Sequence, residues 1–437
     1  MLSQPLPFPE GFLWGCATAA HQVEGDNTNN HWWAWEQEPG RIRDGHVSGI
    51  ACDHYRRFDE DFATARAYGH NAARISIEWS RIEPDEGRWN RAEVDHYRQV
   101  VESLRRHDLT PIVTLHHFTN PLWFERLGGW LSPKAPDLLA RYAGFIAREL
   151  GALVPIWCTI NEPSVVASAQ YIAGVHPPGH RDIGEGMLAS RHLLLAHARA
   201  YHAVKDATAH DPLVGPVLNI SYVEPANPDD PADVRAARGV DGFLHEFYLR
   251  SISGGVVARP VARPDEEPAP EVRDTWDFIG LNYYSRSLIE AGEEGRPFGS
   301  VPEGAETSLM GWEVYPDGIY HCLKRLARYG QPVYITENGT SVRDDLQRRR
   351  YLLRHLARVH RALREGVDVR AYLHWSFCDN FEWAEGWRQW FGLWEHEPGT
   401  LDRRPRPSAA MFRDIARANA ITPEIVERYA PGLDPGA

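Results

Sequence analysis

The stretch at 153–163, LVPIWCTINEP, contains the pattern from which the fold can be predicted. An apolar run of the right length for one buried β-strand ends in an asparagine, a glutamate and a proline. A carboxylate beside a hydrophobic interior costs free energy unless it is paired or used chemically. The pattern recurs at 332–339, PVYITENG, where a second glutamate ends a second apolar run. Glu162 alone could cap the helix that follows, but Glu162 and Glu337 together favour a shared pocket.

Eight short β-rich runs alternate with longer segments whose apolar residues recur at helical spacing. The eight runs are 12–19, 72–79, 110–117, 154–160, 213–220, 276–284, 332–337 and 369–376. The clearest helical segments are 93–108, 135–154, 187–207 and 347–366. Alternating strands and helices indicate a parallel sheet, and strands that are apolar throughout indicate a sheet covered on both faces.

These patterns predict an α/β fold, a single (β/α)8 TIM barrel that occupies residues 1–437 as one domain. A doubly wound sheet is the competing architecture, but no Gly-rich phosphate loop follows the first strand. The stretches 259–274 and 291–311 read as surface loops within the barrel rather than as linkers between domains, because barrel strands are needed on both sides of them.

The composition of the chain limits the kinds of molecule that we expect it to bind. A net charge of −13 disfavours a nucleic-acid binder. No apolar stretch reaches the length of a membrane span, and the N-terminal residues lack the pattern of a signal peptide. Because the five cysteines are scattered and form no CxxC pair, we expect them to be reduced and the protein to be cytoplasmic. The sequence leaves open whether the chain forms a homo-oligomer.

In barrels of this kind, functional side chains lie where the strands end at their carboxyl side. The predicted strand ends carry acids, amides, imidazoles and an aromatic ring, a set typical of a carbohydrate site: Gln22, Glu24, Arg74, Glu78, His116, His117, Asn161, Glu162, Asn282, Tyr284, Glu337, Asn338 and Trp375. The two adjacent histidines point to opposite faces of their strand, so they would not chelate a metal together. We expect His116 in the core, His117 in the pocket, and no metal site.

A pair of carboxyl groups can cleave an acetal. One protonates the leaving oxygen while the other stabilises or attacks the anomeric carbon. Arg74 and Tyr284, on other strand ends, would keep Glu337 ionised, as a nucleophile requires. Glu162 has no evident cation, so its pKa should be higher, as an acid requires. Their separation, which distinguishes retention from inversion, is not given by the sequence.

Several longer motifs occur in a fixed order along almost the whole chain. They are FPEGFLWGCATAAHQVEG (8–25), ARISIEWSRIEP (73–84), TINEP (159–163), DFIGLNYYS (277–285), GWEVYP (311–316), YITENG (334–339), WSFCDNFEWAEGW (375–387) and FGL (391–393). Each motif is moderately specific, and the ordered set is very specific. The sequence resembles glycoside hydrolase family 1, the β-glucosidase family.

The resemblance implies a retaining mechanism that needs no cofactor, with Glu162 as acid and base and Glu337 as nucleophile. Arg74, Tyr284 and Asn282 fall on positions that support these glutamates. The positions that bind the sugar ring are matched by Gln22, His117, Asn161, Trp375, Glu382 and Trp383, and Trp312 matches an aromatic residue on the aglycone side.

Three positions bear on the substrate that the resemblance implies. Glu382 stands where relatives that act on 6-phosphorylated sugars lack an acid, and its carboxylate would repel a phosphate. Glu162 stands where plant thioglucosidases have glutamine, which favours an O-linked aglycone. Phe118 replaces a tryptophan found in many relatives, so the sugar preference stays open.

We therefore expect a retaining exo-β-glycosidase that takes a small-molecule β-glycoside or a short oligosaccharide. The expected activity is that of a β-glucosidase with β-galactosidase and β-fucosidase side activity. The alternatives are a 6-phospho-β-glycosidase and a non-catalytic sugar-binding barrel. Loss of either glutamate would have favoured the second alternative.

Overall fold

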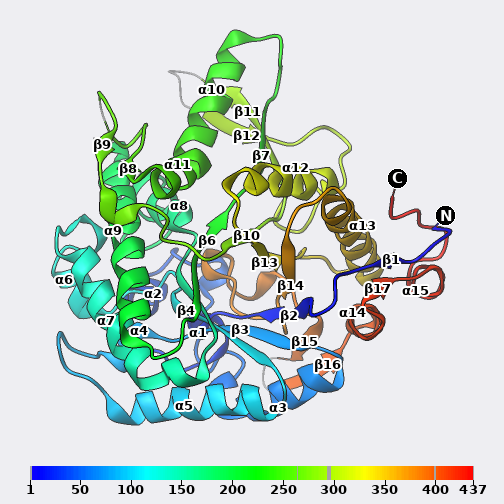
Figure 1. Ribbon diagram of the computed structural model, residues 1–437, viewed down its shortest axis with the longest axis horizontal. Coiled ribbons are helices and arrows are strands. Elements are labelled where there is room, and N and C mark those ends of the chain that lie inside the picture. The colour runs from blue at the N-terminus through cyan, green and yellow to red at the C-terminus, as the bar shows by residue number, and fades with distance from the viewer. Residues whose placement is uncertain (1, 263, 293–296, 398–399, 437) are drawn as a thin grey trace.

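The computed structural model describes residues 2–262, 264–292, 297–397 and 400–436 (Figure 1). Eight parallel strands close into a barrel in chain order. They are β2 (Leu13–Ala17), β3 (Ala72–Ser76), β4 (Thr110–His116), β5 (Ile156–Asn161), β6 (Leu213–Asn219), β10 (Ile279–Asn282), β13 (Val333–Asn338) and β14 (Val369–Trp375). Six of the eight predicted runs contain one of these strands, and β5 and β13 each extend one residue past the predicted run, so the predicted barrel is confirmed.

Several predicted runs extend past the real end of the strand. The run at 12–19 ends as a strand at Ala17, and the run at 72–79 ends at Ser76. The residues just beyond, Thr18, Ala19 and 77–79, are buried although they lie past the strand ends. A sequence pattern cannot distinguish a buried residue that follows a strand from one inside it, so the predicted strand ends lie too far along the chain.

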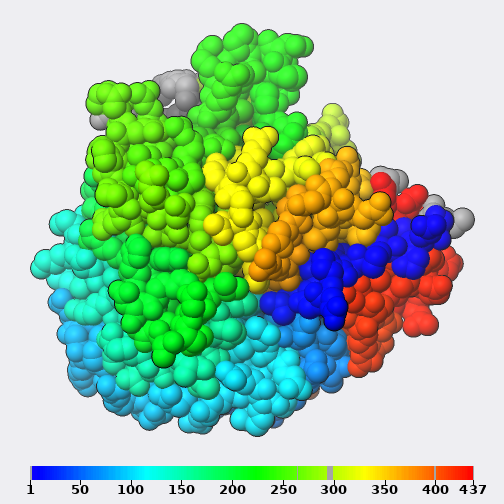
Figure 2. All heavy atoms as spheres, viewed as in Figure 1, coloured from blue at the N-terminus to red at the C-terminus, as the bar shows by residue number. Residues whose placement is uncertain are grey.

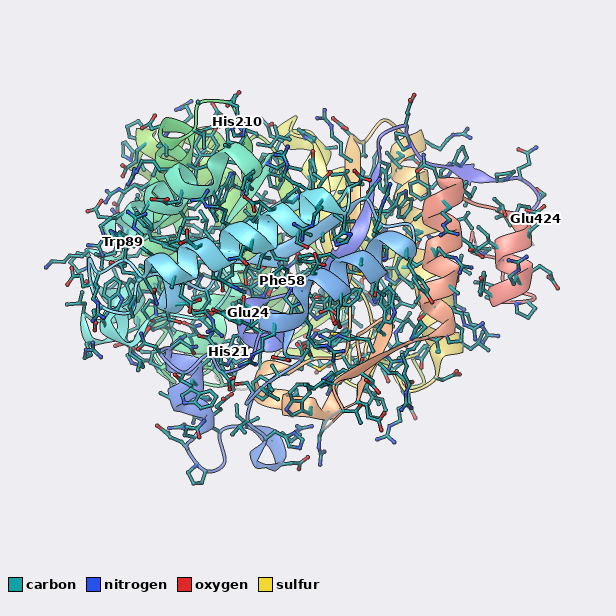
Figure 3. All side chains as sticks on the ribbon, turned by 90° about the horizontal axis from the view of Figure 1, so that it is seen from below. His21, Glu24, Phe58, Trp89, His210 and Glu424 are labelled. Atoms are coloured by element: carbon teal, nitrogen blue, oxygen red, sulfur yellow. The ribbon has the colours of Figure 1, made fainter. Side chains whose placement is uncertain are left out.

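Helices surround the barrel (Figure 1). The longer ones are α3 (His54–Ala67), α5 (Arg91–Arg106), α7 (Ala135–Leu150), α9 (Ile183–Ala207), α10 (Pro231–Asp241), α11 (Phe247–Gly254), α12 (Pro316–Leu326), α13 (Asp345–Arg364), α14 (Pro407–Ala418) and α15 (Pro423–Tyr429). In the view from below, α3, α5 and α14 lie across the outside of the molecule, with Glu424 of α15 beyond them (Figure 3).

The four predicted helices are confirmed, with shifted ends. The helix predicted at 187–207 begins earlier, at Ile183, because the Asp182 side chain caps it by accepting from the Glu185 N–H at 2.9 Å. The helix predicted at 135–154 ends at Leu150, and a 3-10 turn (Gly151–Leu153) follows. Short helices also occupy the loops above the barrel: α1 (Ala20–Val23), α2 (His31–Glu36), α4 (Trp79–Ile82), α6 (Leu122–Arg126) and α8 (Pro163–Val165).

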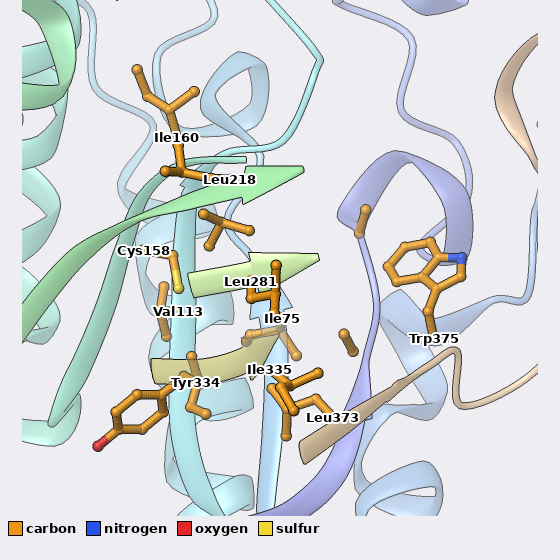
Figure 4. Close-up of a cluster of buried hydrophobic side chains, with 14 of the residues drawn as sticks. Ile75, Val113, Cys158, Ile160, Leu218, Leu281, Tyr334, Ile335, Leu373 and Trp375 are labelled. Atoms are coloured by element: carbon orange, nitrogen blue, oxygen red, sulfur yellow. The ribbon is translucent and has the colours of Figure 1, made fainter. Parts of the chain in front are cut away.

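Buried side chains from β3, β4, β5, β6, β10, β13 and β14, most of them aliphatic, form a hydrophobic cluster (Figure 4). Val113, Ile160, Leu281 and Ile335 are fully buried. Arg74 is the exception among the strand residues because it is a fully buried cation in β3. A buried charge is stable only when it is paired and hydrogen-bonded, so Arg74 marks a place where the barrel interior carries charge.

A small sheet outside the barrel was not predicted. Strands β7 (Tyr222–Pro225), β11 (Arg286–Ala291) and β12 (Pro297–Ser300) form it, and α10 packs beside it (Figure 1). The prediction of a loop at 291–311 is therefore wrong in part, because β11 offers β12 an antiparallel partner that lies before it in the chain. Positions 263 and 293–296 of the two predicted loops lie outside the described residues.

The N-terminal and C-terminal segments lie side by side on the barrel surface (Figure 2). Strand β1 (Leu6–Pro7) pairs antiparallel with β17 (Ala420–Ile421). Two further pairs are β8 (Val256–Val257) with β9 (Glu267–Pro268), and β15 (Trp394–Glu397) with β16 (Asp402–Pro405). Across the described ranges, no helix combines the length and apolar character that crossing a membrane requires.

Candidate active site

A cavity of about 640 Å³ opens at the carboxyl ends of the barrel strands. Nine of the twelve predicted site residues line it: His117, Asn161, Glu162, Tyr284, Trp312, Glu337, Trp375, Glu382 and Trp383. The remaining three, Gln22, Arg74 and Asn282, are fully buried and hydrogen-bond to lining residues. The fold thus brings all twelve together, although they span residues 22 to 383.

Glu337 is the penultimate residue of strand β13 and is 3% exposed. Arg74 donates from Nη1 to Glu337 Oε1 at 2.5 Å, and the Tyr284 hydroxyl donates to Oε2 at 2.6 Å. Both carboxylate oxygens therefore accept a hydrogen bond, one of them from a buried cation. Such bonds favour the ionised carboxylate.

Glu162 follows strand β5 and is 6% exposed. It occupies the N-cap position of α8 in a left-handed conformation (φ 48°), yet its side chain makes no capping hydrogen bond. Its Oε1 instead accepts from Asn282 Nδ2 at 2.8 Å and from Asn219 Nδ2 at 3.0 Å. The reading of Glu162 as a simple helix cap is therefore wrong, since the carboxyl group faces the cavity.

A hydrogen-bond network holds the two glutamates relative to each other. Arg74 also donates from Nη2 to Asn161 Oδ1 at 2.7 Å and from Nε to Thr114 Oγ1 at 2.9 Å. Asn282 Nδ2 donates to the same Asn161 oxygen at 3.1 Å as well as to Glu162. Because the guanidinium and the amides are bonded on several sides, their rotamers are fixed and the carboxyl groups have defined positions.

Burial and mutual repulsion raise the pKa values of the cavity's acids. Burial, and then the Glu337 charge, raise the pKa of Glu162 to about 7. The same two causes raise the pKa of Glu382 to about 8. Burial also raises the pKa of Glu337, and Arg74 and Tyr284 oppose that rise. The raised pKa values favour the protonated forms of Glu162 and Glu382 near neutral pH.

Buried polar groups without a protein partner lie around Glu382 and His117. Gln22 donates from Nε2 to Glu382 Oε2 at 3.3 Å and to the Phe381 carbonyl at 2.8 Å. Within the described part of the chain, Gln22 Oε1 and His117 Nδ1 have no hydrogen-bond partner. An unsatisfied buried polar atom costs free energy, and a bound hydroxyl group would supply the missing partner.

Aromatic rings form the walls of the cavity. The His117 ring stacks within 5.9 Å of Trp375 and 6.1 Å of Trp383, with interplanar angles of 19° and 16°. Trp312 lies 5.3 Å from Tyr284 on another side. Phe118 packs 5.1 Å from Trp383, so the position that departs from the family pattern still supplies an apolar wall. Such walls suit the C–H faces of a sugar ring.

Neighbouring histidines have different surroundings, as predicted. His116 is buried and its Nε2 lies 2.8 Å from Asn120 Oδ1, while His117 lines the cavity. In the described ranges, no three His, Cys, Asp or Glu side chains are grouped so that they could hold a metal ion.

Sequence reasoning missed Asn219 and the residues at the cavity mouth. Asn219 ends β6 and bonds to Glu162, so its place at a predicted strand end was the signal that could have identified it. The other residues that line the cavity come from loops and short helices and do not lie at predicted strand ends: Trp35, Gly40, Arg41, Val165, Gly174, Val175, His176, Arg181, Met310, Ala384, Glu385 and Phe391.

Comparison with known proteins shows the family of this chain. The family model described as glycosyl hydrolase family 1 matches residues 4–421. β-Glucosidase A of Thermotoga maritima is 36% identical, and the alignment covers 95% of this chain and 98% of that protein. A β-galactosidase of Pyrococcus woesei is 33% identical over 97% of this chain and 100% of that protein.

Comparison with solved structures also finds similarity to a β-glucosidase. A β-glucosidase from Thermotoga maritima in complex with glucoimidazole superposes with a TM-score of 0.89 at 35% identity, and the match covers 95% of this chain and all of that one. The family match, these relatives and the barrel place the protein among the glycosidases: the chain belongs to glycosyl hydrolase family 1.

Proposed function

We propose that the protein is a retaining exo-β-glycosidase, and that its main activity is that of a β-glucosidase with β-galactosidase and β-fucosidase side activity. The observation that carries the proposal is the unequal environment of two buried glutamates in one cavity. Glu337 is bonded to a cation and a phenol, whereas Glu162 is bonded to two neutral amides. These surroundings suit a nucleophile and an acid respectively.

In the first step, a Glu337 oxygen attacks the anomeric carbon while the bond from that carbon to the aglycone oxygen breaks. Glu162 transfers its proton to the departing oxygen. A pKa of about 7 keeps much of Glu162 protonated at neutral pH, so the proton is available. The product is a glycosyl ester on Glu337 and a free aglycone alcohol.

The second step restores the enzyme. Esterification removes the Glu337 charge, which is the second-largest cause of the raised pKa of Glu162. The pKa of Glu162 then falls, and its carboxylate accepts a proton from water as the water oxygen attacks the anomeric carbon. The bond to Glu337 breaks, and two inversions leave the sugar with its original configuration. An alcohol in place of water would give transglycosylation.

The proposed substrate is a small β-glycoside or short oligosaccharide with one unphosphorylated terminal sugar, as in the degradation of larger saccharides. Gln22, His117 and Glu382 offer hydrogen-bonding groups for hydroxyls, and Trp375 offers a flat apolar face. Relatives named as β-glucosidase and β-galactosidase support glucose and galactose as candidate sugars. The five free, buried cysteines support our further proposal of a cytoplasmic location.

The alternative of a 6-phospho-β-glycosidase is less well supported. A phosphate group needs cations, whereas the Glu382 carboxyl group accepts a hydrogen bond from the neutral amide of Gln22. The alternative of a non-catalytic sugar-binding barrel leaves two buried carboxyl groups, with their raised pKa values, without a use.

The test is hydrolysis of p-nitrophenyl β-glucoside, β-galactoside, β-fucoside and 6-phospho-β-glucoside by the wild type and by Glu337→Ala. We expect the wild type to cleave the unphosphorylated substrates and the variant to be inactive. Azide should restore the variant's activity and yield the α-glycosyl azide, because azide attacks where the nucleophile is missing.

A matched control is Glu125→Gln. Burial also raises the pKa of Glu125 to about 7, but this residue does not line the cavity. Its variant should keep activity. A wild type that cleaves none of the substrates, or a Glu337→Ala variant as active as the wild type, would overturn the proposal.

A further inference from the structure

The mouth of the cavity carries two arginines that the proposed chemistry does not use. Arg41 lies in the loop after α2, and Arg181 lies in the loop before α9. Both line the cavity and both are exposed, whereas the glutamates Glu162 and Glu337 are buried deeper in it. The arginines therefore lie on the side from which an aglycone would leave.

Most charges along the cavity are balanced by a neighbour. Glu337 is paired with Arg74 at 2.5 Å. Glu385, which lines the mouth, is paired with Arg43 at 3.1 Å. Arg41 is paired with Glu38 at 2.8 Å.

Arg181 differs from these groups. Among the described residues, the exposed Arg181 guanidinium forms no ion pair and no side-chain hydrogen bond. Its neighbour His180 is paired with Glu185 at 2.7 Å, so Glu185 does not balance the Arg181 charge. Burial raises the pKa values of Glu162 and Glu382 to about 7 and 8, which favours their uncharged forms near pH 6. The positive charge of Arg181 therefore has no negatively charged partner among these two acids.

The backbone on both sides of Arg181 is held in place. The His180 N–H donates to the Gln170 carbonyl at 3.0 Å, and the Asp182 N–H donates to the Tyr171 carbonyl at 2.8 Å. The Arg181 stem packs against Gly174, where an added Cβ would lie 2.7 Å from Arg181 Cγ. The guanidinium is thus exposed on a fixed stem rather than on a free loop.

Apolar side chains line the cavity together with this charge. Val175 is 51% exposed, and Met310 and Trp312 are half-buried. Trp35 is buried beneath the Arg41 guanidinium, which lies 3.8 Å from the centre of its ring. Trp35 also packs against the loop that carries Arg181, because an added Cβ at Gly179 would lie 2.6 Å from its ring. An aromatic ring that carries an anionic group matches both features of the mouth.

We propose that the aglycone side of the cavity selects aryl β-glycosides whose aromatic aglycone bears a carboxylate, with Arg181 as the residue that recognises the carboxylate. This proposal rests on the proposed function, since it names the substrate class of the same cavity. Arg41 contributes less because Glu38 offsets its charge. The overall charge of −13 repels anions at long range, so the selection is a local contact.

The experiment compares kcat/KM for 4-carboxyphenyl β-glucoside with that for the neutral 4-carbamoylphenyl β-glucoside at pH 6. The ratio of the two values is measured for the wild type, Arg181→Gln and Arg181→Lys. Comparing ratios between enzymes cancels the difference in leaving-group chemistry. An exposed ion pair predicts a ratio about two- to five-fold higher in the wild type than in Arg181→Gln. Arg181→Lys should retain most of the preference.

Two controls distinguish the contact from general charge effects. Arg350→Gln removes an exposed arginine of α13 that does not line the cavity, and it should leave the ratio at the wild-type value. Raising the salt to about 0.5 M should lower the ratio in the wild type and leave it unchanged in Arg181→Gln.

Equal ratios in the wild type and Arg181→Gln would overturn this proposal while leaving the glycosidase assignment intact. If the ratios are equal but the carbamoyl substrate is cleaved normally, the proposed role of Arg181 is wrong and the proposed function stands. If the enzyme cleaved neither substrate nor the p-nitrophenyl glycosides, both this proposal and the proposed function would be overturned.

Discussion

The substitution Glu162→Gln tests the proposed acid most directly. Glutamine keeps the shape of the side chain and an oxygen that can accept from Asn219 and Asn282, so the cavity should be preserved. It removes the proton that assists the leaving group. General acid catalysis contributes about 10²- to 10⁴-fold to a rate. We expect a loss of that order for alkyl or carbohydrate aglycones and a much smaller loss for 2,4-dinitrophenyl β-glucoside, whose aglycone leaves without help.

The titration of Glu162 also predicts how kcat/KM depends on pH. An acid must be protonated to act, and the pKa of Glu162 is about 7. Wild-type kcat/KM on poorly activated substrates should therefore fall as pH rises through 7. With one titrating group, about nine-tenths of the maximum should remain at one pH unit below the pKa and about one-tenth at one unit above it. Glu162→Gln should lack this alkaline limb on the dinitrophenyl substrate.

The assay is the pH profile of kcat/KM for both substrates in the wild type, Glu162→Gln and the control Glu125→Gln. The control removes a carboxyl group of similar raised pKa outside the cavity, so its profile should match the wild type. Equal losses on the two substrates in Glu162→Gln, or an alkaline limb that persists in that variant, would refute the assignment of Glu162 as the acid.

Three further outcomes follow from the contacts. Asn219→Ala removes a donor that favours the charged form of Glu162, so the pKa of Glu162 should rise and the alkaline limb of kcat/KM should move to higher pH; an unmoved limb would contradict the contact at 3.0 Å. Arg74→Met leaves the buried Glu337 charge without its cation, and urea denaturation at pH 7 should show about 3–5 kcal/mol lower stability; a loss below about 1 kcal/mol would argue against a buried ion pair. Burial raises the pKa of Glu382 from 4.5 to about 8, so the folded state retains a proton that the unfolded chain releases, and this acid lowers stability as pH rises from 4.5 to 8. Glu382→Gln should therefore gain Tm relative to the wild type at pH 9 but not at pH 4, and calorimetry that finds equal differences at both would contradict the raised pKa.

The sequence by itself determined the barrel and the position of its acids. Apolar runs at strand spacing alternate with helical segments, and each such run is a local property of neighbouring residues. The carboxyl ends of parallel barrel strands meet at one face, so TINEP and YITENG placed Glu162 and Glu337 in one region before any contact was known. The same rule predicted that Arg74 and Tyr284 would lie near Glu337, as the hydrogen bonds confirm.

Only the tertiary structure decided the protonation of the acids and the shape of the cavity mouth. A pKa depends on how much water every neighbour removes and on charges that approach from distant parts of the chain, so the raised pKa of Glu382 could not be predicted from its motif. Likewise, Arg181 lines the cavity because its loop is held by backbone bonds to the segment Val166–Ile172, and no periodic pattern records such contacts. Strands and helices follow from short-range periodicity, whereas a site's charge and its opening depend on residues that meet only after the chain has folded.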